Sequence, residues 1–134
     1  MRIRTIDTWL SGVVLAHLLV TFVHGAAHRS AQVGLGPAGM LFVLIVIEIA
    51  PLVGLGLSLA GRRIGGWIVA SSMAASLLFG LINHFLIGGP DHVSSVAADS
   101  RALFTSSAIL LVLSEAAGVL VGARSAARPQ EEWS

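Results

Sequence analysis

The first apolar run of the chain, residues 9–28, reads WLSGVVLAHLLVTFVHGAAH and carries three of the five histidines. These are His17, His24 and His28. At about 100° per residue, their spacing places the three imidazoles within about 40° of one helical face. No charged residue interrupts residues 8–28, and at about 1.5 Å per residue such a helix crosses a hydrocarbon layer of about 30 Å. The run therefore predicts a membrane span with a polar histidine stripe.

The composition of the whole chain supports a membrane location. Its 134 residues are 55% hydrophobic and 11% charged, and the mean hydropathy is +0.88, which favours one integral membrane domain over a soluble one. The chain has no cysteine, which excludes disulfides, thiolate metal sites and iron–sulfur clusters. The basic residues are arginines at the ends of the apolar runs, so the expected partner is the lipid bilayer and nucleic acid is not expected.

Four long apolar runs predict four spans, over about residues 9–28, 38–60, 66–88 and 102–123. Short connections between them predict an all-α integral membrane protein, an up-down-up-down four-helix transmembrane bundle. The basic start also fits a signal peptide, but the first run is longer than the core of a cleavable signal. Residues 124–134 are predicted to form a short, disordered cytoplasmic tail.

The arginines predict how the bundle is oriented. Arg29 and Arg101 lie on one side of the predicted bundle, whereas the other side carries Arg2, Arg4, Arg62, Arg63, Arg124 and Arg128. Cytoplasmic loops of membrane proteins are enriched in basic residues. We therefore expect a multi-pass protein of the cell membrane with both termini in the cytoplasm, and with the loops that hold Arg29 and His92 facing outward.

The two halves of the chain resemble each other. Glu48-Ile-Ala-Pro-Leu in the second span is similar to Glu115-Ala-Ala-Gly-Val in the fourth. Each follows a span with a histidine near its outer end, His24 or His84. This pattern leaves open a duplicated helical hairpin, whose two repeats would be parallel.

Small residues predict where the helices pack closely. Ser72, Ser76, Gly80 and His84 recur every four residues in the third span, which predicts a small contact face there. Gly118 and Gly122 share a face with Glu115 and predict a second one. In the second span, Pro51 predicts a kink at which a neighbouring helix pairs the freed carbonyl.

The histidines predict a metal site near the outer surface. His24 and His28 are one helical turn apart, so both imidazoles can bind one ion, and the outer end of the third span brings His84 to the same depth. His92 is an optional fourth ligand. Nitrogen and oxygen ligands suit a zinc, copper or iron ion. Haem b between His24 and His84 is a less favoured variant.

Three ionisable residues lie nearer the middle of the membrane, where each costs about 3 kcal/mol on insertion scales. Glu48 and Glu115 are candidate metal ligands or proton carriers, or protonated acids bonded across the bundle. His17 is two turns deeper than His24, too far for the same ion. It is either a further proton carrier or a neutral histidine bonded to a neighbouring helix.

Three functions of different classes fit this pattern. The first is a metalloprotein with an outward-opening site lined by histidine and glutamate, in a redox or metal-handling role. The second is a small proton-coupled transporter that uses Glu48 and Glu115, for which a homodimer is expected because four spans form a narrow pathway. The third is a non-catalytic subunit of a larger membrane complex that docks through its small faces. Whether the protein is an enzyme is left open.

Overall fold

The computed structural model describes residues 5–128, with side chains described from Thr8 onward. It is 81% helix, and no strand occurs in the part described. Four helices are long and apolar enough to cross a membrane: Thr8–Ser30, Pro37–Leu59, Ile64–Leu86 and Ala98–Ala126. The predicted all-helical integral membrane fold is confirmed, and the four helices fit a multi-pass membrane protein.

Two of these helices contain π-helical turns. The first span is α1 (Thr5–Ser30) and the fourth is α5 (Ala98–Ala126). The second consists of α2 (Pro37–Phe42), the π-helical segment η1 (Val43–Ile49) and α3 (Ala50–Leu59). The third consists of α4 (Ile64–Leu81) and the π-helical segment η2 (Ile82–Leu86). Because π turns in α-helices are frequent at functional sites, it is notable that Glu48 lies in η1 and His84 in η2.

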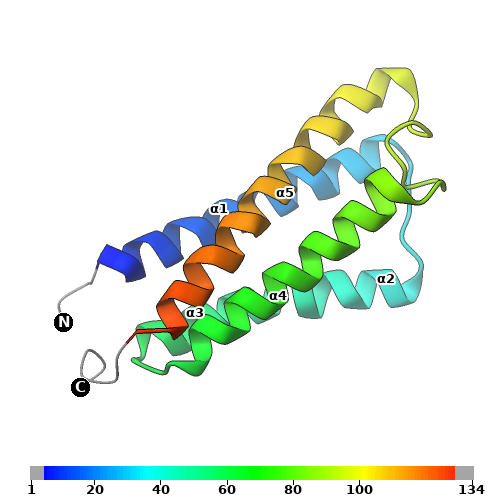
Figure 1. Ribbon diagram of the computed structural model, residues 1–134. Coiled ribbons are helices and arrows are strands. Elements are labelled where there is room, and N and C mark those ends of the chain that lie inside the picture. Colours follow the sequence, from blue (N-terminus) through cyan, green and yellow to red (C-terminus); the bar gives the residue numbers. More distant parts are fainter. Residues whose placement is uncertain (1–4, 129–134) are drawn as a thin grey trace.

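The helices form a ring. Figure 1 shows that the chain reverses direction from each long helix to the next, so that α1 begins and α5 ends at the same end of the bundle. Helix α5 packs against α1 and α4, α4 packs against α3, and α1 contacts the second span through α3. We call the opposite end, where α1 ends and α5 begins, the histidine end.

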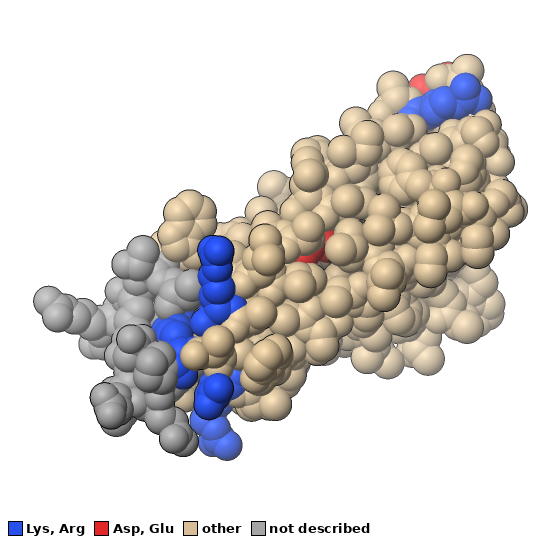
Figure 2. Space-filling model, viewed as in Figure 1, with Lys and Arg blue, Asp and Glu red and all other residues tan. Residues whose placement is uncertain are grey.

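Arginine side chains lie at the two ends of the bundle. On the face that Figure 2 shows, the broad band between them has no basic side chain and is interrupted by a small group of acidic atoms. Large apolar side chains such as Phe22, Leu78 and Leu113 are exposed, as expected for a surface covered by lipid. Arg63 Nε donates to the Ala126 carbonyl over 2.5 Å, which joins the α3–α4 turn to the end of α5. Arg2 and Arg4 lie outside the described residues.

Glycines bring α4 and α5 into close contact. A Cβ atom on Gly66 would lie 2.6 Å from the Ala126 nitrogen, and one on Gly122 would lie 2.8 Å from the Ala70 nitrogen. One on Gly118 would meet the Met73 side chain at 2.8 Å. Backbones this close leave no room for a side chain. The packing face predicted around Glu115 is therefore confirmed.

The prediction of a small contact face in the third span fails at Gly80. A Cβ atom there would meet only His84 Cδ2, at 3.9 Å, because this part of α4 borders a cavity and not a helix. Ser72 and Ser76, lower on the same face, are buried as expected.

The predicted tail is shorter than residues 124–134. Helix α5 continues to Ala126, and Arg128 is buried, with Nη2 3.0 Å from Ser125 Oγ. The prediction of disorder is thus wrong for residues 124–128, because the last turn of α5 is held by the α3–α4 turn. Residues 129–134 lie outside the described part of the chain.

Candidate metal centre

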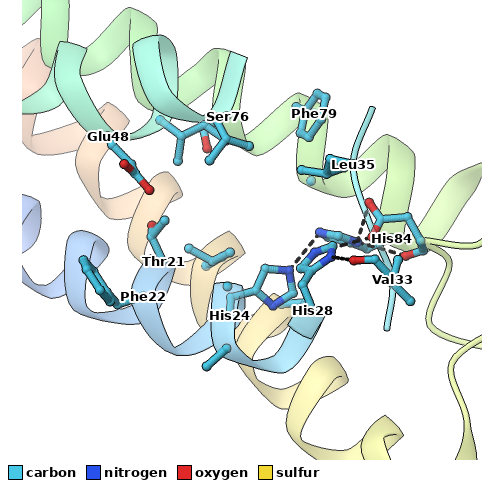
Figure 3. Close-up of a pocket in the computed structure, with 18 of the residues that line it drawn as sticks. Thr21, Phe22, His24, His28, Val33, Leu35, Glu48, Ser76, Phe79 and His84 are labelled. Atoms are coloured by element: carbon cyan, nitrogen blue, oxygen red, sulfur yellow. Dashed lines mark hydrogen bonds and ion pairs between the residues drawn. The ribbon is translucent and has the colours of Figure 1, made fainter. Parts of the chain in front are cut away.

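Three histidines meet at the histidine end of the bundle. His24 and His28 extend from α1 and His84 extends from η2. One ring nitrogen of each lies within 4.8 Å of the other two. The centroids of the His24 ring and the His28 ring are 4.7 Å apart, and those of His24 and His84 are 4.8 Å apart. Figure 3 shows the rings gathered at one end of a cavity.

A hydrogen bond from α5 fixes the proton position on His24. Its Nδ1 lies 2.8 Å from Ser107 Oγ. The Ser107 hydroxyl itself lies 2.7 Å from the Leu103 carbonyl, which can only accept, so the hydroxyl donates there and accepts from His24. The proton of the neutral ring is therefore on Nδ1, and His24 Nε2 carries a free lone pair.

The same argument applies to the other two rings. His28 Nδ1 donates to the Val33 carbonyl over 3.1 Å, and His84 Nδ1 donates to the Asp91 carbonyl over 3.0 Å. In each neutral ring the lone pair is then on Nε2. Metal-binding histidines characteristically donate their other N–H to an oxygen in this way, which fixes the tautomer and the ring orientation.

Two turns of backbone bring these carbonyls to the rings. At the end of α1, the Val33 amide donates to the His28 carbonyl and the Gln32 amide donates to the Arg29 carbonyl, with Gln32 at a φ of 55°. These are the bonds of a Schellman motif. After η2, the Val93 amide donates to the His84 carbonyl over 3.0 Å, which folds the following loop back over the histidines.

The sequence did not identify Asp91 as part of this site. Its Oδ1 lies 3.4 Å from His28 Nε2, and its Oδ2 lies 3.4 Å from His84 Nδ1. Both oxygens are buried, and neither has a hydrogen-bond partner among the described residues. In the sequence, the Gly-Gly-Pro break at residues 88–90 could have indicated this contact, because it allows the loop to fold back to the end of η2.

His92, predicted as an optional fourth ligand, lies outside the group. Its Nδ1 lies 2.7 Å from Ser94 Oγ, and its Nε2 donates to the Phe85 carbonyl over 3.2 Å. Both ring nitrogens thus have partners in the loop and in η2. Asp91, the preceding residue, faces the histidines in its place.

A buried phenylalanine covers one side of the three rings. The Phe104 centroid lies 5.0 Å from that of His24, 4.9 Å from that of His28 and 5.3 Å from that of His84. Phe104 packs with Ala27 and Val96 in a small apolar cluster. This wall keeps water away from one side of the rings and leaves the other side open to the cavity.

The cavity has a volume of about 900 Å³ and extends from the histidines toward the middle of the bundle. Both predicted glutamates line it. Glu48 points into it beside Thr21 (Figure 3). Glu115 is 2% exposed, and its Oε1 accepts a hydrogen bond from the Ser76 hydroxyl. Its Oε2 has no partner within the described part of the chain.

His17 lies apart from the cavity and has a structural contact. Its Nε2 donates to the Ile47 carbonyl over 3.1 Å. Pro51 has no N–H to pair with this carbonyl four residues earlier. His17 therefore provides the bond from a neighbouring helix that the sequence predicted for the kink at Pro51.

No protein-family model, curated protein or solved structure matches this chain. The function of the protein is therefore inferred from the arrangement of its own residues.

Proposed function

We propose that this protein is a cell-membrane metalloprotein that binds one transition-metal ion between His24, His28 and His84, in a redox or metal-handling role. One observation carries the proposal. His24 Nε2 and His84 Nε2 lie 3.1 Å apart, and the hydrogen bonds at both Nδ1 atoms place a lone pair on each of them. Two lone pairs at this distance repel each other unless a shared proton or a metal ion lies between them.

The spacing suits a metal ion. Two nitrogens at 2.0–2.1 Å from a tetrahedral zinc ion are about 3.3 Å apart, close to the separation of the two Nε2 atoms. A haem iron is bound from opposite faces and would separate them by about 4 Å. The arrangement therefore supports a single ion better than haem b.

Asp91 supports a cation independently of the rings. A buried carboxylate with no donor carries a large desolvation cost, and a divalent ion among the histidines would offset it. The carboxylate can bind the ion directly, or it can keep the His28 and His84 rings in position. Three imidazoles and one carboxylate suit zinc, copper or iron. The side open to the cavity corresponds to the free position that catalytic metal sites keep.

The arginine pattern supports a site that faces outward from the cytoplasm. Arg62, Arg63 and Arg124 lie at the end opposite the histidines, and the basic end of a bundle usually faces the cytoplasm. With both termini in the cytoplasm, the metal ion would lie near the outer surface and could exchange with the medium there.

Cobalt(II) titration of the detergent-purified protein, first stripped of bound metal with a chelator, tests the proposal. We expect one equivalent to bind with the visible absorption of tetrahedral cobalt, and zinc to displace it. Binding should weaken at low pH, because protons compete with the metal ion for the imidazole lone pairs. His84→Ala should abolish the spectrum and His92→Ala should retain it. A colourless titration of the wild type would refute the proposal.

A further inference from the structure

The cavity beside the metal centre has an apolar middle and two polar ends. We propose that it binds a lipid-soluble molecule whose cationic or hydrogen-bond-donating group contacts Glu48 at the end away from the histidines. Its apolar body would occupy the space between the helices. This inference does not depend on a metal ion at the histidines.

The size and the walls of the cavity fit such a molecule. About 900 Å³ is in the range of cavities that bury a small ligand, about 300–1,000 Å³. The walls are predominantly apolar, and their largest apolar side chains are Phe22, Leu35, Met40, Ile47, Phe79 and Leu111. Such walls disfavour the passage of a hydrated ion and favour an apolar body.

Exposed side chains indicate that the cavity opens toward lipid. Phe22 on α1 is 81% exposed and Met40 on α2 is 59% exposed, yet both also line the cavity. Helix α1 contacts the second span through α3 and through the bond from His17 to Ile47 in η1, and among the described residues it makes no contact of similar extent with α2. An apolar molecule can therefore enter from the bilayer between α1 and α2.

The inner end of the cavity selects the charge of the ligand. Glu48 points into the cavity (Figure 3) and Glu115 forms part of its wall. Glu115 Oε2 is buried, and none of the residues described here donates to it. An ionised carboxylate only accepts hydrogen bonds, so this end favours an ammonium or hydroxyl group and rejects an anion.

The two polar ends are well separated. Ser76, which donates to Glu115, and His84 lie on one continuous helical run, eight residues apart. At about 1.5 Å per residue this is about 12 Å. A ligand group at Glu115 therefore does not share contacts with a metal ion at the histidines. Figure 3 shows Glu48 on the opposite side of the cavity from His84, so the two proposals can fail separately.

The experiment compares decylamine with decanoate on chelator-treated protein in nanodiscs of neutral lipid, with empty nanodiscs as the background. We expect saturable binding of decylamine and much weaker binding of decanoate. Glu48→Gln should weaken decylamine binding about 10- to 100-fold, the effect of a lost charged hydrogen bond. Asp99→Asn, an exposed acid outside the cavity, should leave it unchanged.

A second pair of variants tests the cavity itself without removing a charge. Gly80→Leu places a side chain in the cavity and should block decylamine binding. Gly12→Leu lies on the outer surface of α1, with nothing within 4 Å of its Cβ position, and should not block it. Equal binding of decylamine and decanoate to the wild type would overturn the proposal, as would decylamine binding unaffected by both Glu48→Gln and Gly80→Leu.

Discussion

His24 Nε2 and His84 Nε2 face each other across 3.1 Å, although the two residues are 60 positions apart in the chain. Each ring donates through Nδ1 to an oxygen of another element, Ser107 Oγ for His24 and the Asp91 carbonyl for His84. The fold thus supplies two lone pairs to one small volume. Metal binding should therefore depend on the residues that accept hydrogen bonds from the Nδ1 atoms of these rings.

Ser107→Ala should weaken metal binding about 10- to 100-fold, the usual effect of losing the partner of a metal-binding histidine. Without the hydroxyl, the His24 ring loses the acceptor that keeps its proton on Nδ1. Ser106→Ala is the matched control, because that hydroxyl only donates to the Leu103 carbonyl of its own helix. Zinc affinities from competition with a chelating dye measure both variants, and equal affinities would contradict the tautomer assignment.

Asp91→Asn should also lower zinc affinity about 10- to 100-fold, with little change in helix content. The substitution keeps the backbone carbonyl that holds His84 and removes the negative charge beside His28. His92→Asn, one residue further along the same loop, should have an affinity close to that of the wild type. If His92→Asn were the more damaging change, the loop would be oriented differently from the structure.

His17 and Pro51 should be energetically coupled. His17→Ala removes the donor to the Ile47 carbonyl, and Pro51 has no N–H that could replace it. In a Pro51→Ala background the helix can form this hydrogen bond itself, so His17→Ala should lower the free energy of unfolding by less. We expect a coupling free energy of about 0.5–2 kcal/mol, from unfolding in detergent of the wild type and the three variants. Additive effects would show that the His17 contact is incidental. Metal content per folded protein should be unchanged in His17→Ala.

Gly122→Leu should prevent the bundle from assembling. The Cβ atom of a side chain at this position would lie only 2.8 Å from the Ala70 backbone nitrogen. Gly12→Leu and Gly80→Leu should both fold, since their Cβ positions have space. Thermal unfolding in detergent should separate the first variant from the other two. If Gly80→Leu were as unstable as Gly122→Leu, this result would show that Gly80 contacts another helix and does not face a cavity.

Hydropathy and helical spacing were sufficient to predict the fold class and the packing face around Glu115. Both follow from local patterns, apolar runs for the spans and a four-residue repeat for the glycines. Gly80 belongs to a similar repeat but faces a cavity. Spacing shows which residues share a face, but it does not show whether another helix covers that face.

The candidate metal centre was only partly predictable for a related reason. His24 and His28 are neighbours on one helix, so their spacing indicated a common site. Asp91 and Ser107 reach the rings through a folded loop and through another helix, and no periodicity records such contacts. Asp91 and His92 are adjacent, and both residue types can bind metal ions. The fold of the loop, with the bonds from Val93 to His84 and from His92 to Phe85, determines which of them faces the site.

The most direct test is elemental analysis of the protein purified in detergent without added metal or chelator, together with the His24→Ala, His28→Ala and His84→Ala variants. We predict about one zinc, copper or iron ion per chain in the wild type and in His17→Ala, and a large loss in each of the three variants. A wild-type protein that contains no metal and takes none up, or metal content that survives all three substitutions, would contradict the assignment of this site.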